Sequence, residues 1–99
     1  MFARMHTLET TREKHEIGLG IVREEFLPWI REATGFVGLI GLVDENHEKA
    51  YVLTLWRDEA ALEASAEAGD KLSGLASAVT GSKRRSLENY EVTLFDIRQ

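Results

Sequence analysis

Two apolar runs near the middle of the chain form its strongest pattern. The first covers Phe36–Asp44 and the second Ala50–Trp56, and the residues between them, Glu45–Lys49, are polar. Two apolar runs joined by a short polar link are typical of a β-hairpin. Both runs are too apolar for strands with one face in water, and both are too short to cross a membrane. We therefore expect a central hairpin that is buried on both faces.

The segment before the hairpin, Arg12–Ala33, has its apolar residues at helical spacing. One stripe of this helix consists of Val22, Phe26, Trp29 and Ala33. Thr10 or Thr11 is expected to open the helix, and Gly35 is expected to end it. Pro28 lacks an N–H, and its ring clashes with the carbonyl four residues back. We therefore expect a kink or a short second helix at Pro28.

A second helix is predicted after the hairpin. Asp58 is a good N-cap, and apolar residues recur at helical spacing from Ala61 to Val79. Glycines weaken this helix, and we expect a break near Gly69-Asp70. The inner stripe is rich in small side chains. Because small side chains facing a sheet leave room, this stripe indicates a cavity between helix and sheet.

Both ends of the chain carry a further strand pattern. Met1–Leu8 and Asn89–Arg98 are expected to be strands, and Thr80–Arg85 is expected to be a loop. The resulting order, β-α-β-β-α-β, is the ferredoxin-like arrangement. The sequence thus predicts one α+β domain over residues 1–99, with a four-stranded antiparallel sheet and two helices on one face.

Two helices can cover only one face of such a sheet. In the second strand of the hairpin, Tyr51, Leu53 and Leu55 point to one face, while Val52 and Trp56 point to the other. The uncovered face would be a large apolar patch in a monomer. Packing against a second copy of the chain would bury it. We therefore expect a homodimer formed through the sheet face.

Composition narrows the range of partners. The 99 residues fit a single domain, and the net charge of −5 disfavours nucleic acid and anionic membranes as partners. The chain has no cysteine, so it can have neither a disulfide framework nor a thiolate zinc site. Arg4 and His6 interrupt any apolar signal-peptide region at the N-terminus. A cytoplasmic location is expected.

The chain resembles the antibiotic biosynthesis monooxygenase-type domains of the dimeric α+β barrel superfamily. The resemblance rests on the opening FAR, on VREEFLPWI, on GFVGLIGLVD and, most specifically, on TLWRDEAALEAS. It implies two copies packed sheet to sheet, each with a cavity between its helices and its sheet. Some members of the group oxidise polycyclic phenols with molecular oxygen and without metal or flavin. Others bind and degrade haem, and many have no known activity.

The chain departs from the group at two points. Members with known chemistry combine a polar residue, often asparagine, near the end of the first strand with the tryptophan that Trp56 matches. Here the first strand offers Arg4 and His6 instead. The haem-degrading members have a histidine ligand on the second helix, whereas residues 58–81 contain none. A haem-degrading role through the usual ligand is therefore not expected, and haem binding without that ligand is a third hypothesis. The leading hypothesis, a cofactor-free oxygenase, needs no cofactor.

Three residues are the candidates for catalysis. The imidazole of His6 could act as a general base, because it titrates near neutral pH. Arg4 could steady an anionic oxygen on the substrate. Trp56 could stack on a planar ligand, since the indole presents a flat π-face. Strand parity leaves it open whether Arg4 and His6 point into the cavity or into the dimer interface, and Trp56 could instead be a core residue.

Four apolar side chains are the candidates for lining a substrate cavity. They are Trp29, Phe26, Trp56 and Leu72. A plain core role is the alternative for each. No metal site is expected, because the acidic residues are spread over helix surfaces. The leading hypothesis is a cofactor-independent monooxygenase that acts on a planar aromatic or polyketide-like substrate. The alternative is a non-catalytic or stress-associated protein of the same fold that binds a small apolar or aromatic ligand.

Overall fold

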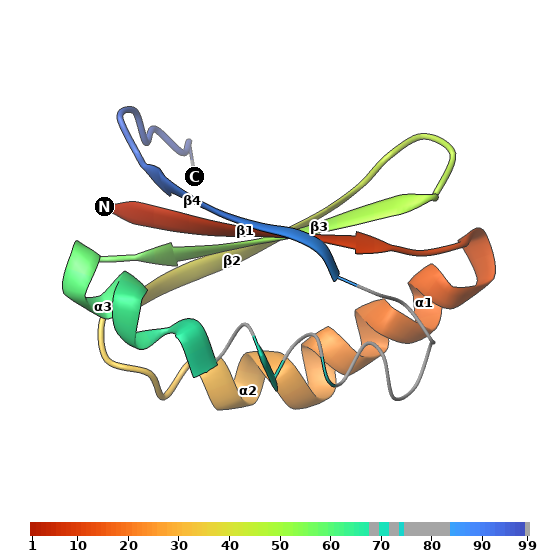
Figure 1. Cartoon of the computed structure of the whole chain (residues 1–99), viewed down its shortest axis with the longest axis horizontal. Coiled ribbons are helices and arrows are strands. Elements are labelled where there is room, and N and C mark those ends of the chain that lie inside the picture. The colour runs from red at the N-terminus through yellow and green to blue at the C-terminus, as the bar shows by residue number, and fades with distance from the viewer. Residues whose placement is uncertain (68–69, 72–73, 75–83, 99) are drawn as a thin grey trace.

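The computed structural model describes residues 1–67, 70–71, 74 and 84–98. Its helices and strands are β1 (Phe2–Glu9), α1 (Arg12–Ile21), the π-helical turn η1 (Val22–Phe26), α2 (Leu27–Ile30), β2 (Phe36–Val43), β3 (Lys49–Trp56), α3 (Glu59–Ala64) and β4 (Arg84–Glu91). The strands pair in the order β2-β3-β1-β4, and every pair is antiparallel. The helices lie on one face of the sheet (Figure 1). The predicted ferredoxin-like fold is confirmed.

A polar side chain caps the N-terminus of α1, and another caps the N-terminus of α3. The Oγ1 atom of Thr11 accepts a hydrogen bond from the backbone N–H of Lys14 at 3.2 Å, which caps α1. Asp58 does the same for α3, where its Oδ1 accepts the N–H of Ala61 at 2.8 Å. That bond is the main reason why the pKa of Asp58 lies below its usual value. Both predicted helix starts are confirmed.

The first helical segment changes its geometry just before Pro28. Residues Val22–Phe26 form a π-helical turn, and the N–H of Leu27 reaches back to the carbonyl of Val22. Pro28 then lies in the first turn of the short helix α2. Because proline has no N–H and crowds the preceding turn, widening the helix ahead of it relieves the conflict. The predicted short second helix is present, and the irregular turn lies N-terminal to the proline.

Two backbone turns place the hairpin against the helices. Gly35 has a φ of 81°, and its carbonyl accepts the N–H of Arg57 at 2.8 Å. The hairpin turn is held by Asp44, whose Oδ1 accepts the N–H groups of Glu48 at 2.8 Å and Lys49 at 3.1 Å. The hydrogen bond from Lys49 is the largest cause of the lowered pKa of Asp44. The turn also contains His47, with a φ of 57°.

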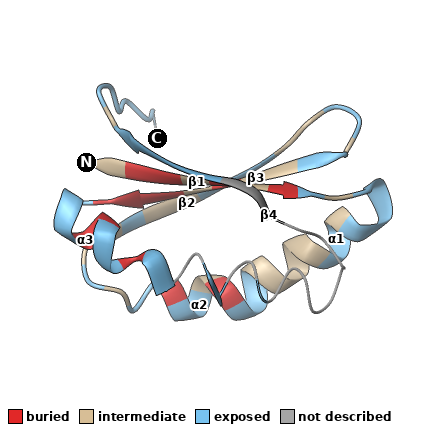
Figure 2. Cartoon of the chain, in the orientation of Figure 1, coloured by how far each residue is buried: buried red, intermediate tan, exposed pale blue. Residues whose placement is uncertain are grey.

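One face of the sheet packs on the helices. The buried cluster contains Leu8, Phe26, Ile30, Val52, Trp56, Ala61 and Leu62. Figure 2 shows the buried residues in the central strands and in α2 and α3. The opposite face carries exposed apolar side chains, among them Ile40 and Tyr90, which are 38% and 44% exposed. Both faces of the sheet are therefore apolar, as the sequence predicts, and the helices cover one of them.

Two boundaries differ from the prediction. The last strand covers Arg84–Glu91, whereas Asn89–Arg98 was the predicted range, so part of the predicted loop is strand. Apolar alternation continues to Arg98, but after Val92, which donates its N–H to the carbonyl of Met1, the chain is no longer a strand. It turns away on the side opposite the helices (Figure 1). Alternation shows that a segment can pair, but a strand also needs a neighbour.

The second predicted helix is interrupted earlier than expected. Its first part, α3, ends at Ala64, where Ser65 leaves helical geometry and its hydroxyl donates to the carbonyl of Leu62 at 2.5 Å. Such local bonds from serine compete with the helical ladder. Ala66 and Glu67 are helical again, as are Asp70 and Lys71, and the predicted end at Val79 lies outside the described residues. Gly69, at the predicted break, lies outside the described residues.

Candidate functional site

Strand register decides which face Arg4 and His6 occupy. They pair with Thr54 and Val52 on β3 and alternate with residues of the open face. Phe2 and Leu8, which share their parity, pack in or against the core below the helices. Arg4 and His6 therefore lie on the helix-facing side, where they are 5% and 1% exposed. The sequence leaves open which face of the sheet Arg4 and His6 occupy, and the structure shows that it is the face that packs on the helices.

A chain of hydrogen bonds links Trp56 to Arg4. The indole Nε1 of Trp56 donates to Oγ1 of Thr54 at 3.0 Å, and that hydroxyl donates to the carbonyl of Arg4 at 3.4 Å. The guanidinium Nε of Arg4 donates to Oδ1 of Asn89 on β4 at 3.0 Å. Thr54, which is buried, and Asn89, which is exposed, join this polar group only through strand pairing, so inspection of single segments does not reveal them.

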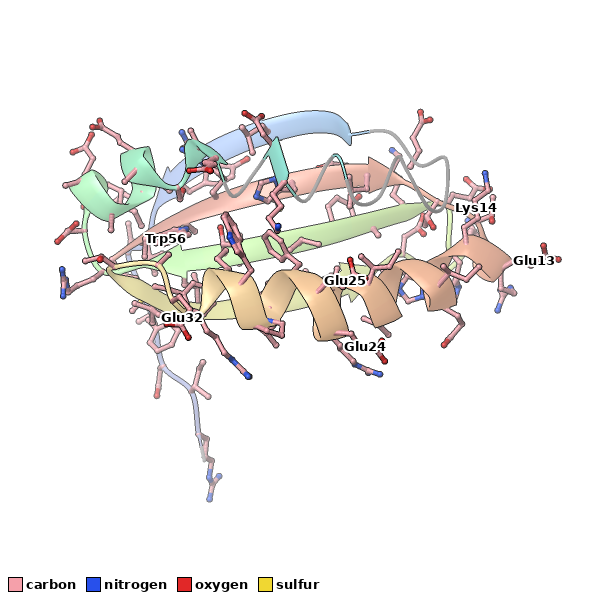
Figure 3. The ribbon with its side chains drawn as sticks, turned by 90° about the horizontal axis from the view of Figure 1, so that it is seen from below. Glu13, Lys14, Glu24, Glu25, Glu32 and Trp56 are labelled. Atoms are coloured by element: carbon pink, nitrogen blue, oxygen red, sulfur yellow. The ribbon has the colours of Figure 1, made fainter. Side chains whose placement is uncertain are left out.

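Trp56 is enclosed on all sides. It is 1% exposed, and the ring of Phe36 meets it edge to face with centroids 5.5 Å apart. Phe26, another predicted lining residue, is fully buried in the same cluster. Figure 3 shows Trp56 at the end of the sheet beside α3, far from Lys14 on α1. In this arrangement both Trp56 and Phe26 are core residues.

The other two predicted lining residues lie elsewhere. Trp29 is 36% exposed, and Nζ of Lys71 lies 4.9 Å from the centre of its ring, a cation–π geometry. Leu72 lies outside the described residues. His6, Arg4 and Trp56 thus share the helix-facing layer of the sheet, whereas Trp29 lies at the surface beside Lys71.

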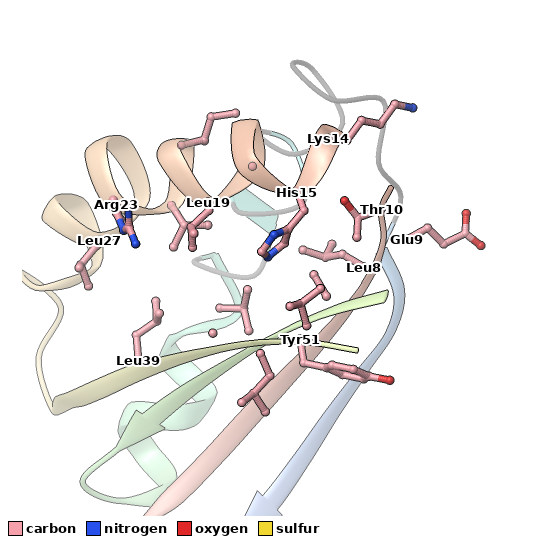
Figure 4. Close-up of a pocket in the computed structure, with 18 residues that line it drawn as sticks. Leu8, Glu9, Thr10, Lys14, His15, Leu19, Arg23, Leu27, Leu39 and Tyr51 are labelled. Carbon is pink, nitrogen blue, oxygen red and sulfur yellow. The ribbon is translucent and has the colours of Figure 1, made fainter. Parts of the chain in front are cut away.

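A cavity of about 390 Å³ lies between the first helical segment and the hairpin. Its apolar wall includes Leu8, Leu19, Val22, Leu27, Leu39 and Val52 (Figure 4). His6, Arg4, Trp56, Trp29 and Phe26 are not among the described residues that line it. From Val52 to Trp56 the strand advances roughly 13 Å, at about 3.3 Å per residue. The cavity, which we call the hairpin cavity, thus lies at the other end of the sheet from Trp56.

His6 nevertheless lies next to the wall of the hairpin cavity. It is paired with Val52 across the sheet and is two residues from Leu8 on the same strand. Cross-strand partners on one face have Cβ atoms about 5 Å apart. Val52 and Leu8 both line the cavity. His6 itself is 1% exposed and lies beside this wall without lining the cavity.

The mouth of the cavity carries polar groups that the sequence analysis did not single out. His15 on α1 is half-buried and turns toward the sheet (Figure 4). Its ring meets that of His47 edge to face, with centroids 5.5 Å apart. Arg23 comes from η1 and lines the same cavity. A π-helical turn changes which residues share a helix face, so regular spacing could not place Arg23.

The described residues form neither a metal site nor a membrane-spanning helix. Within the described ranges, no three histidine or carboxylate side chains converge to hold a metal ion. Among the same residues, no helix has the length and apolar character needed to cross a membrane.

Comparisons with known proteins point to the same fold. No protein-family model matches the chain, and no curated protein matches it either. Solved structures do match. An antibiotic biosynthesis monooxygenase is 20% identical, with a TM-score of 0.66 over 95% of this chain and 100% of the other. A Streptomyces coelicolor monooxygenase in complex with nanaomycin D is 17% identical, with a TM-score of 0.64 over 97% and 92%.

A third similar structure comes from a protein described as dimeric. It is a dimeric ferredoxin-like protein from an uncultured marine organism, 13% identical, with a TM-score of 0.74 over 96% of this chain and 97% of the other. Likeness at these identities concerns the fold. The chain has the ferredoxin-like fold of the antibiotic biosynthesis monooxygenase proteins, over nearly its whole length.

Proposed function

We propose that this chain is a cofactor-independent monooxygenase that binds a planar aromatic or polyketide-like molecule in the hairpin cavity. The observation that carries the proposal is the cavity itself. Its volume of about 390 Å³ falls in the range of small-molecule sites, and its wall is mainly apolar. The fold is that of monooxygenases, one of them solved with nanaomycin D.

The proposed reaction needs only a base and oxygen. His6, beside the cavity wall, takes a proton from a phenol or from an activated ring carbon. The resulting carbanion transfers electrons to O₂ and forms a C–O bond, which gives a hydroperoxide. Loss of water then leaves a carbonyl, so one oxygen atom stays in the product. The substrate supplies all the electrons.

A second function, binding without catalysis, is favoured by the buried polar group. The indole N–H of Trp56 is already used by Thr54, and Nε of Arg4 is already used by Asn89. Neither side chain lines the hairpin cavity. A protein of this kind would hold or carry the aromatic molecule and leave its chemistry unchanged.

Oxygen uptake separates the two functions. Wild-type protein would be assayed with polycyclic phenols and hydroxyanthrones in an oxygen electrode, beside His6→Gln, Trp56→Phe and Gly41→Leu. Gly41 lines the cavity, and a Cβ there meets nothing within 4 Å, so leucine fills the cavity without backbone strain. Catalysis requires uptake in the wild type that Gly41→Leu and His6→Gln abolish. Saturable binding with no uptake would leave the binding function, and uptake unaffected by either variant would refute the proposed site.

We further propose that the chain is a homodimer formed through the open sheet face. The exposed apolar residues on that side of the molecule support the proposal, among them Ile40 and Leu42 on β2. The dimeric ferredoxin-like neighbour supports it as well. Light scattering should give twice the mass of 11.2 kDa, and Ile40→Lys should reduce it to the monomer mass. A wild-type monomer at micromolar concentration would contradict the proposal.

A further inference from the structure

We propose that the ligand of the hairpin cavity is an anion: a planar apolar molecule whose acidic group is bound by the guanidinium of Arg23. The inference rests on the proposed function, because it assigns a chemical class to the molecule held in the same cavity. It adds a recognition residue and a ligand charge that neither the fold nor the comparisons supply.

The charged residues that line the cavity have a net positive charge, whereas the protein as a whole is acidic. The chain has a net charge of −5, yet the charged residues lining the cavity are Lys14 and Arg23 against Glu9. Figure 4 shows Glu9 and Lys14 extending outward from the rim. Arg23 is therefore the permanent charge that remains next to the apolar wall. A local cationic group on an acidic protein raises the local concentration of anionic ligands.

Arg23 is available to bind an acid. Among the described residues, the salt bridge present is that between Arg57 and Asp58, and Arg23 takes part in none. It is an exposed residue that lines the cavity beside Val22 and Leu27. A guanidinium presents a planar fork of donors that matches a carboxylate or a sulfonate. An exposed arginine beside an apolar cavity wall, without a carboxylate partner among the described residues, is suited to supply charge recognition to a ligand.

His15 limits the length of the ligand and provides a polar contact at the end of the cavity away from Arg23. It lies eight residues before Arg23 in the first helical segment, a rise of about 12 Å at 1.5 Å per residue. Its ring turns toward the sheet (Figure 4) and meets the ring of His47 edge to face. An imidazole can donate to or accept from a hydroxyl or carbonyl group. The ligand class is thus a planar acid of two to three fused or linked rings, with a polar group at the far end.

A matched pair of dyes tests the acidic group separately from binding. Anilinonaphthalene sulfonate and phenylnaphthylamine share one aromatic scaffold, and only the first carries an acid. Both would be titrated by fluorescence against wild type, Arg23→Gln, Arg23→Lys and Arg31→Gln. Arg31 is an exposed arginine at the end of α2 that does not line the cavity, so it serves as the matched control. Gly41→Leu tests whether the dyes bind in the hairpin cavity, and Ile40→Thr tests whether they bind on the open sheet face.

We expect Arg23→Gln to weaken sulfonate binding about five- to tenfold and to leave the neutral dye within twofold, a loss typical of one partly exposed ionic hydrogen bond. Arg23→Lys should recover part of the loss, Arg31→Gln should change neither dye, and added salt should weaken the sulfonate alone. Equal effects of Arg23→Gln on both dyes, or none on the sulfonate, would overturn the inference and leave the cavity standing. Binding that Gly41→Leu does not weaken and Ile40→Thr does would overturn the cavity assignment itself.

Discussion

Gly35 holds the turn between α2 and β2 against α3, and replacing it with alanine perturbs two features at once. The backbone has a φ of 81°, which L residues adopt at a cost of about 1–2 kcal/mol. A Cβ at this position would lie 2.5 Å from the Cβ of Ala61, so one of the two segments must move. Overpacking of this kind costs about 1–3 kcal/mol. Gly35→Ala should therefore lower the free energy of unfolding by about 2–5 kcal/mol.

Urea denaturation followed by circular dichroism, at one fixed protein concentration, measures this loss. Gly20→Ala is the matched control, because Gly20 is inside α1 and a Cβ there meets nothing within 4 Å. The same chemical change should there raise stability by about 0.5–1 kcal/mol. Adding Ala61→Gly to Gly35→Ala should recover the overpacking part, and the φ cost should remain. A Gly35→Ala protein as stable as wild type would refute the described packing of α3 on this turn.

Three further changes have definite expected outcomes. Thr54→Val should cost about 1–3 kcal/mol, because it leaves the buried indole N–H of Trp56 without its acceptor, whereas Thr54→Ser should cost less; urea titrations of both decide this. The pKa of Asp44 is lowered in the folded protein, so its stabilising contribution is present above its usual pKa of about 3.8 and is lost as pH falls through the folded value. Asp44→Asn should flatten the acid side of the plot of urea midpoint against pH, and an unchanged slope would contradict the hydrogen bonds of the hairpin turn. Gly41→Leu should abolish binding of aromatic probes with unfolding stability retained, and full binding would show that the hairpin cavity is not used.

The sequence could predict the features that depend on local patterns. The hairpin and the N-cap at Asp58 each follow from a few neighbouring residues, and the structure has both. The predicted stop at Gly35 is too late, because α2 ends at Ile30 and Gly35 lies in the turn that leads into β2. The predicted last strand lies too far toward the C-terminus, because Leu94 and Ile97 extend the apolar pattern beyond Glu91, where β4 ends. In the structure these two side chains are 85% and 55% exposed and have no strand beside them. Pairing is a tertiary property, so alternation alone could not locate the end of β4.

The candidate site was harder to predict for the same reason. Parity showed that Arg4 and His6 share a face, but only the core contacts of Leu8 on the same face show that it is the helix side. The hairpin cavity joins α1, η1 and three strands, and its polar residues His15 and Arg23 look like ordinary surface residues of a helix in the sequence. The sequence prediction placed the site at Trp56, because a tryptophan at a strand end is a conspicuous feature. Trp56 lies at the end of the sheet opposite the hairpin cavity.

The position of the ligand is the central claim, and amide NMR tests it most directly. Two-dimensional spectra of the labelled protein would be recorded during a titration with anilinonaphthalene sulfonate. The account predicts saturable shifts at the amides around Leu8, in Gly18–Arg23 and in Gly41–Val43, which border the hairpin cavity. It predicts no comparable shifts at Arg57–Leu62, beside Trp56. Shifts concentrated at Arg57–Leu62 would contradict the account and restore the site to the tryptophan end of the sheet.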